Sequence, residues 1–179
     1  APVLSFIGSQ IMDEDSQLVL LLEAIDPEDD LLTFEAQFDE GTLDIDGNEL
    51  TISPAANFNG TIDLWVSVSD GSLNDSETVS ITVLPVNDAP TISLIDDTQV
   101  SEDSEFQLQL NSEDIDSSDL YYSVSIDGNG SAYIDNDNLY INPFSGYNGP
   151  IDITVYVSDG YLTDETTFSL SVLPVNDAP

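Results

Sequence analysis

Residues 61–70 read TIDLWVSVSD, and residues 78–90 read TVSITVLPVNDAP. In the first stretch every second residue from Ile62 to Val68 is aliphatic, and the second stretch alternates in the same way up to its proline. A two-residue period that is rich in β-branched side chains predicts strands with one buried face. These two stretches are therefore predicted to be β-strands.

The same pattern occurs a second time along the chain. The sequence LPVNDAP occupies residues 84–90 and again residues 173–179. An offset of 88 places Glu14-Asp15-Ser16 on Glu102-Asp103-Ser104, and an offset of 89 places the VSDG at 68–71 on the VSDG at 157–160. This period is much longer than the roughly 20–50 residues of solenoid repeats, so it indicates tandem globular domains. We predict one repeat over residues 1–88 and a second over residues 89–179.

The expected fold class is all-β. Short alternating stretches separated by Asp, Gly and Asn are typical of a Greek-key β-sandwich. The stretch 17–32 resembles a helix by propensity, but its partner FQLQL at 106–110 alternates cleanly, so both are predicted to be strands. Asp46-Gly47 and Asp127-Gly128 are predicted hairpin turns. The linker Pro85–Pro90 contains no glycine, and its prolines favour a stiff connection that holds the domains end to end.

Composition excludes most chemistry. The 179 residues include no lysine, arginine, histidine or cysteine, but 36 aspartates and glutamates, which give a formal charge of −36. A chain without these side chains has no catalytic triad, thiol or Schiff base, and it lacks the cations that bind nucleic acid. Only two-carboxylate chemistry remains, and we predict that the chain is not an enzyme. No apolar run approaches the 18 residues or so of a membrane span, so no membrane insertion is expected.

The excess of carboxylates requires countercharge from outside the chain, because net charge far from zero destabilises a compact state. Ligands that are all oxygen, without thiols or imidazoles, favour Ca²⁺ over zinc, copper or iron. Any single aspartate could instead be a turn former or a solvated surface charge that binds no metal. What favours calcium is the recurrence of the acidic set in both repeats.

The VSDG stretches followed by VNDAP resemble the end of a cadherin repeat, and they are similar to the cadherin-like tandem repeats of large bacterial surface proteins and adhesins. The resemblance covers nearly the whole chain twice. It implies Ca²⁺ at the junction between repeats, with ligands Glu14, Asn87, Asp88, Asp114, Asp116 and Asp159. It also implies half-sites at the two ends of the chain, formed by Asp26, Glu28, Asp70, Glu102, Asn176 and Asp177.

Three departures from the cadherin pattern predict fewer than three ions at the junction. Ala89 follows Asp88 where the family has a second Asn, Asn57-Phe-Asn59 replaces a mid-domain acidic motif, and Glu28 replaces the second Asp of the DxD motif. We expect one or two ions, with Asn57 or Asn59 near Glu14.

Two functions are predicted from these observations. The first is a calcium-rigidified structural or adhesive rod segment of an extracellular bacterial adhesin, whose partners are neighbouring repeats of a longer parent chain at the cell surface. The alternative is a calcium-dependent module that binds a polysaccharide or another cell-surface protein, with Trp65, Tyr121 and Tyr122 as the candidate contact residues.

Overall fold

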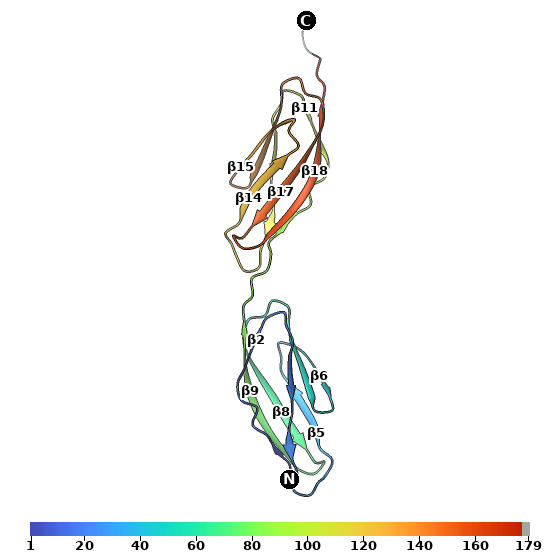
Figure 1. Ribbon diagram of the computed structural model, residues 1–179, viewed down its shortest axis with the longest axis vertical. Coiled ribbons are helices and arrows are strands. Elements are labelled where there is room, and N and C mark those ends of the chain that lie inside the picture. The colour runs from blue at the N-terminus through green and yellow to red at the C-terminus, as the bar shows by residue number, and fades with distance from the viewer. Residues whose placement is uncertain (177–179) are drawn as a thin grey trace. The chain divides into compact units, whose positions relative to one another are not determined.

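The computed structural model describes residues 1–176, and these residues form β-strands and no helix, so none of them forms a helix that could cross a membrane. The chain divides into two compact all-β units, and the division lies between Val86 and Asn87 (Figure 1). Asn87 and Asp88 both hydrogen-bond to residues of the second unit, which places them with that unit, two residues ahead of the boundary predicted from the sequence.

The first unit has a four-stranded sheet in the order β2-β9-β8-β5 and a three-stranded sheet in the order β3-β7-β6, with a short β1-β4 pair beside them. Its strands are β1 (Val3–Leu4), β2 (Gln10–Asp13), β3 (Leu18–Leu21), β4 (Ala24–Ile25), β5 (Thr33–Gln37), β6 (Gly41–Asp46), β7 (Glu49–Pro54), β8 (Gly60–Ser69) and β9 (Asn74–Leu84).

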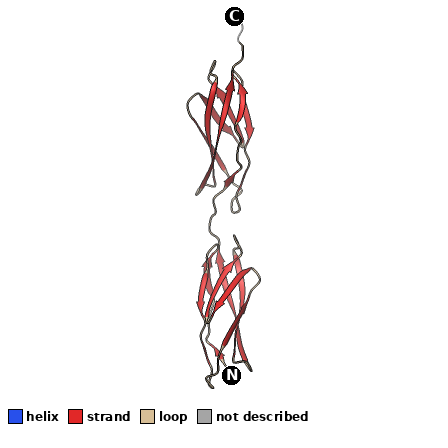
Figure 2. Cartoon of the chain, turned by 90° about the vertical axis from the view of Figure 1, so that its right-hand side faces the viewer, coloured by secondary structure: helices blue, strands red, loops and turns tan. Residues whose placement is uncertain are grey.

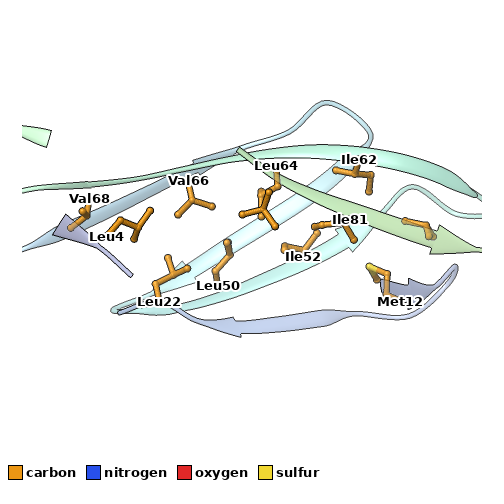
Figure 3. Close-up of a cluster of buried hydrophobic side chains, with 12 residues drawn as sticks. Leu4, Met12, Leu22, Leu50, Ile52, Ile62, Leu64, Val66, Val68 and Ile81 are labelled. Atoms are coloured by element: carbon orange, nitrogen blue, oxygen red, sulfur yellow. The ribbon is translucent and has the colours of Figure 1, made fainter. Parts of the chain in front are cut away.

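The core of the first unit lies between the two sheets. Ile62, Leu64, Val66 and Val68 on β8 face it, and each is fully buried (Figure 3). Leu50 and Ile52 of β7 approach from the opposite sheet, where they are also fully buried, and neighbours from other strands complete the cluster. The alternation that predicted these strands is therefore the alternation between core and solvent.

The second unit repeats this arrangement. Its sheets have the orders β11-β18-β17-β14 and β12-β16-β15, with a β10-β13 pair. Its strands are β10 (Thr91–Ile92), β11 (Thr98–Ser101), β12 (Phe106–Gln109), β13 (Ser112–Glu113), β14 (Tyr121–Ile126), β15 (Gly130–Asp135), β16 (Asn138–Pro143), β17 (Gly149–Ser158) and β18 (Thr163–Leu173). In each unit the loops gather at the two ends of the sandwich (Figure 2).

The first strand of each unit changes sheets. In the first unit β1 pairs with β4 antiparallel, and the chain then crosses over so that β2 pairs with β9 in parallel, with Gln10 opposite Ile81. The second unit does the same with the β10-β13 and β11-β18 pairs. In each unit the strand pairs other than this parallel one are antiparallel among the described residues.

The strand predicted over 17–32 is confirmed only in part: β3 and β4 lie in this stretch, and residues 26–32 form a loop. The two strands are separated at Leu22, a buried residue whose N–H donates to the carbonyl of Asn48. The hairpin at Asp46-Gly47 is confirmed by the antiparallel β6-β7 pair. The prediction of a hairpin at Asp127-Gly128 is wrong, because β14 and β15 belong to different sheets and this loop crosses between them. The corresponding hairpin of the second unit joins β15 to β16.

Candidate metal centre

Carboxylates collect at the end of the second unit where its chain begins. Asn87 donates from Nδ2 to Oδ2 of Asp159 over 2.7 Å, and the N–H of Asp88 donates to Oδ2 of Asp116 over 2.7 Å. Asp159 lies in the loop that follows β17, and Asp116 lies in the loop between β13 and β14. Three segments that are far apart in the sequence therefore meet at this end of the unit.

The two carboxylate oxygens of Asp114 differ in their hydrogen bonding. Oδ1 accepts the N–H groups of Asp116 and Ser117, both over 2.8 Å, which fixes the loop that follows β13. Oδ2 is buried and accepts no hydrogen bond. A buried carboxylate oxygen without a donor costs free energy, and this chain has no basic side chain that could approach it.

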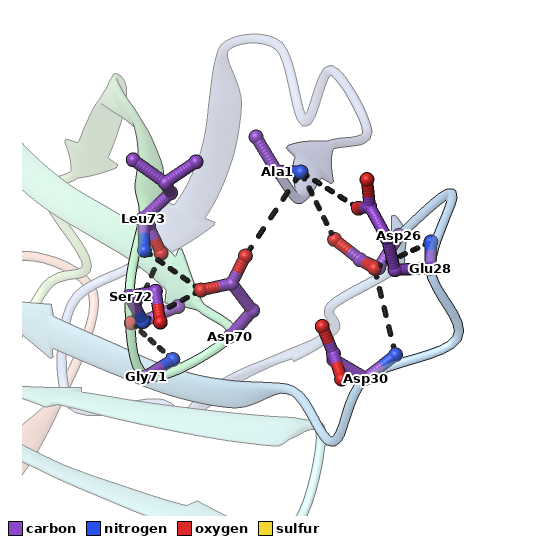
Figure 4. A network of polar contacts seen from close by, with 9 residues as sticks. Ala1, Asp26, Glu28, Asp30, Asp70, Gly71, Ser72 and Leu73 are labelled. Carbon is purple, nitrogen blue, oxygen red and sulfur yellow. Dashed lines mark hydrogen bonds and ion pairs between the residues drawn. The ribbon is translucent and has the colours of Figure 1, made fainter.

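The first unit has the equivalent arrangement at Asp26 (Figure 4). Oδ1 of Asp26 accepts the N–H of Glu28 over 2.8 Å, and Oδ2 is buried and accepts no hydrogen bond. The α-ammonium of Ala1 lies 3.4 Å from this Oδ2, 3.0 Å from Oε2 of Glu28 and 4.0 Å from Oδ2 of Asp70. The carboxylates of Asp26, Glu28 and Asp70 therefore lie near one another at this end of the unit.

Local hydrogen bonds keep these carboxylates charged. Backbone N–H groups of Leu73 and Ser72 lower the pKa of Asp70, and the side chain of Asn87, aided by two backbone N–H groups, lowers the pKa of Asp159. Burial raises the pKa of Asp26, but backbone N–H donors and the ammonium of Ala1 outweigh it and the pKa falls below its ordinary value. All three are therefore anions at neutral pH.

A buried glutamate lies at the opposite end of each unit. Glu14 is 3 % exposed, and its Oε1 accepts the N–H of Val86 over 2.7 Å while its Oε2 accepts Nδ2 of Asn59 over 3.3 Å. Glu102 is 7 % exposed, and its Oε1 accepts the N–H of Val175 over 2.6 Å. Each glutamate holds the chain just after the last strand of its unit.

The donor set fits calcium better than any softer metal, because it consists of carboxylate and amide oxygens alone. The Oδ2 atoms of Asp26 and Asp114 are buried and accept no hydrogen bond, so they are suited to a cation. Within residues 1–176, however, no three acidic side chains meet as closely as a preformed metal cluster requires. Calcium–oxygen distances of about 2.3–2.6 Å would require these loops to contract.

The structure thus brings together the predicted residues Asn87, Asp88, Asp114, Asp116 and Asp159, and separately Asp26, Glu28 and Asp70. Glu14 and Glu102 lie at the other end of their own units, Asn176 is within the described chain, and Asp177 lies outside the described residues.

One further carboxylate belongs to the acidic end of each unit and was not predicted. Oδ2 of Asp75 accepts the N–H of Leu4 over 2.9 Å, and Oδ2 of Asp164 accepts the N–H of Ile92 over 3.0 Å. These aspartates are related by the 89-residue offset, which is the signal in the sequence that could have identified them.

The aromatic residues that the sequence suggested for ligand contact are divided between the two units. Trp65 belongs to the first unit and is 37 % exposed, whereas Tyr121 of the second unit is 66 % exposed. Tyr122 points to the opposite side of β14 from Tyr121 and packs against the core.

Comparison with known proteins identifies the fold. A sequence model described as bacterial Ig domain matches residues 1–82 and again residues 87–171. The chain belongs to the bacterial Ig domain family. The two Ig domains correspond to the two compact units, and they are cadherin-like or Ig-like repeats in tandem. None of the curated proteins matches this chain.

Solved structures support the same architecture. Domains EC1-2 of human protocadherin-24 match with a TM-score of 0.60 and 18 % identity over 98 % of this chain and 99 % of that one. Drosophila N-cadherin EC1-4 matches with a TM-score of 0.58 and 18 % identity over 98 % of this chain and 50 % of that one. An endo-fucoidan hydrolase of glycoside hydrolase family 107 matches at a TM-score of 0.43 and 20 % identity, over 98 % of this chain. The Ig-domain pair spans only 29 % of that hydrolase and half of the N-cadherin structure. At these identities the likeness to the two cadherin structures concerns the fold alone.

Proposed function

We propose that this pair of Ig domains is a calcium-binding structural segment of an extracellular bacterial surface protein or adhesin. Neighbouring repeats of the same parent chain are its partners, and its role is mechanical and adhesive rather than catalytic. The observation that carries the proposal is the pair of equivalent aspartates, Asp26 and Asp114, whose Oδ2 atoms are buried without a hydrogen bond in a chain that contains no basic side chain.

Calcium would contribute the charge that the chain lacks. At the acidic end of the second repeat, carboxylates of Asp114, Asp116 and Asp159 with the amide oxygen of Asn87 would supply its ligands. Each carboxylate has at least one oxygen bonded to N–H donors, and Asp159 has both, so these side chains are oriented before a metal binds. Binding to the folded state would stabilise it by RT ln(1 + [L]/Kd), about 2.7 kcal/mol at a hundredfold excess of calcium over Kd.

The same ion would restrict the linker. Val86 is bonded to Glu14 of the first repeat, and the next residue, Asn87, is bonded to Asp159 of the second. Each repeat therefore holds one side of the Val86–Asn87 peptide bond. Calcium at the second repeat would strengthen the hold on Asn87 and Asp88, and so limit the rotations that are open to the linker.

Isothermal titration of the chelator-treated protein with CaCl₂ tests the site. We expect Kd in the range of about 10⁻⁴–10⁻³ M that is typical of extracellular calcium modules. Asp114→Asn keeps the shape of the side chain and removes its charge, and it should weaken binding at least tenfold. Asp152→Asn, on the exposed side of β17, removes the same charge elsewhere and serves as the matched control.

Equal affinities for the two variants would show that the protein attracts calcium only through its overall charge. Small-angle scattering of the wild-type protein, with calcium and then with chelator, tests the effect on the linker. A narrower distribution of conformations in calcium is expected, and an unchanged distribution would refute the stiffening role even if calcium binds.

A further inference from the structure

The outer face of the three-stranded sheet in the second repeat carries a regular set of polar and aromatic side chains. Strand register places Gln107 of β12, Tyr140 of β16 and Tyr133 of β15 in one row across the sheet. The alternate residues of these strands, Leu139 and Ile141 among them, face the core. The row of Gln107, Tyr140 and Tyr133 therefore points to solvent at the middle of this face.

The two tyrosines form a stacked pair. Their ring centroids are 4.8 Å apart and their planes differ by 8°. β15 is an edge strand of its sheet, so Tyr140 covers one face of the Tyr133 ring, and Tyr133 remains 49 % exposed. The open ring surface at the edge of the sheet is an apolar plane with a polar hydroxyl at its rim, which suits a ligand that has both C–H and O–H groups.

Amide and carboxylate groups that are already held in place surround this pair. Nε2 of Gln107 donates to Oη of Tyr140 over 3.2 Å, and Nδ2 of Asn142 donates to Oε1 of Glu105 over 2.8 Å. Burial against its neighbours, and then the Glu105 carboxylate, raises the pKa of Tyr133, so that its hydroxyl stays a proton donor. An amide side chain has two donors and a two-pair acceptor, so Gln107 and Asn142 keep capacity for a ligand.

This face is absent from the first repeat. Its central row, from β3, β7 and β6, consists of Val19, Thr51 and Asp44. The two repeats share their strand order, so the fold itself does not require two tyrosines and a glutamine at these positions. A repeat that serves only as a spacer has no need of this difference.

We propose that this face, centred on Tyr133, Tyr140 and Gln107, binds a neutral oligosaccharide. A pyranose ring would stack on the open face of Tyr133, and its hydroxyls would bond to the Gln107 and Asn142 amides and the Glu105 carboxylate. The formal charge of −36, without a single basic side chain, repels phosphorylated, sulfated and uronic-acid ligands. Ligand hydroxyls donate to carboxylates and amides without such a penalty. The site goes beyond the calcium proposal, because none of its residues belongs to the acidic ends of the repeats.

Affinity electrophoresis in gels containing soluble neutral polysaccharides, followed by isothermal titration with cellohexaose, xylohexaose, laminarihexaose and mannohexaose, tests the site. At least one hexasaccharide is expected to bind, with the same affinity in calcium and in chelator. Because sugar binding does not require calcium, this result can be interpreted whether or not the protein binds calcium. Tyr133→Ala should weaken it at least tenfold, whereas Tyr133→Trp should keep it because stacking is preserved. Tyr121→Ala removes an exposed tyrosine from β14 in the other sheet and should change nothing.

Retained binding by Tyr133→Trp shows that a loss in Tyr133→Ala reflects stacking rather than unfolding, and melting temperatures of both variants confirm it. Three results would overturn the proposal: no binding of any of the four sugars at millimolar concentration, an equal loss in Tyr133→Ala and Tyr121→Ala, or binding of hexalysine that depends on Tyr133 where no sugar binds. The last result would make the face a site for basic peptides.

Discussion

Replacing Glu14 with alanine tests whether the buried glutamate holds the end of the first repeat. The carboxylate accepts a 2.7 Å bond from the N–H of Val86 and a 3.3 Å bond from the side chain of Asn59. A hydrogen bond to a charged group contributes about 1.5–3 kcal/mol. Asn59 is exposed and regains a partner from water, so the short bond to Val86 dominates. Glu14 is a buried anion without a positively charged partner, so its removal also relieves a desolvation cost that offsets part of the loss. The expected net destabilisation is about 2 kcal/mol.

For a domain of this size a loss of about 2 kcal/mol lowers Tm by roughly 8–16 °C. The measurement is made in chelator, so that any bound calcium does not contribute. Trp65 is the only tryptophan and lies in the first repeat, so its fluorescence follows the unfolding of that repeat alone, while circular dichroism follows both. Glu14→Gln keeps an acceptor for Val86 and should lose less.

Glu102→Ala is the matched control, because Glu102 makes the same contact in the second repeat. Glu102→Ala should leave the Tm of the first repeat, measured by tryptophan fluorescence, unchanged and should lower the Tm of the second repeat. An unchanged tryptophan transition in Glu14→Ala would refute the reasoning, and so would an equal shift of that transition in Glu102→Ala.

Three more outcomes are expected. Gly130→Ala should destabilise the second repeat by about 1–3 kcal/mol, because the added Cβ would lie 2.7 Å from the carbonyl oxygen of Asn142. Ser131→Ala, on the exposed side of β15, should have little effect. Urea unfolding compares the two variants, and equal stabilities would contradict the close approach of the backbone at Gly130. In chelator, wild type should be more stable than Asp159→Asn above about pH 4, and the difference in unfolding free energy should shrink as the pH falls. The reason is that a lowered pKa favours the folded state only while the carboxyl group is charged. A difference that stays constant down to about pH 2 would contradict this pH dependence. NaCl should raise the Tm of the metal-free protein by screening its self-repulsion, and a scanning-calorimetry series without such a rise would show that the net charge of −36 costs little.

The sequence predicts the strands well where alternation is long and unbroken, as in β8 and β17, because burial of one sheet face imposes that period. It predicts poorly where the chain passes between sheets. Asp127-Gly128 has turn chemistry, but turn chemistry does not say whether the next strand pairs with the last one or with another sheet.

The resemblance to cadherin repeats implied the acidic sets, and the 88- and 89-residue offsets align their members between the two repeats. The state of each oxygen was not predictable. That Oδ1 of Asp114 is bonded to its own loop while Oδ2 is left without a donor depends on the loop backbone, which has no pattern in the sequence. The same holds for Tyr133 and Tyr140, seven residues apart, which stack only because of the β15-β16 register.

The parallel pairing of β2 with β9, and of β11 with β18, has a consequence under mechanical load. In each repeat the pair joins the segment where the chain enters to the segment where it leaves. Tension that pulls the two termini of a repeat apart slides these strands along one another, so that the hydrogen bonds of the pair resist in shear and must break together. Antiparallel neighbours pulled apart from one end would instead open one bond at a time. The β1-β4 and β10-β13 pairs come earlier along the chain and would be loaded before the parallel pair, so this short parallel pair is where each repeat would next resist, and it would do so in shear.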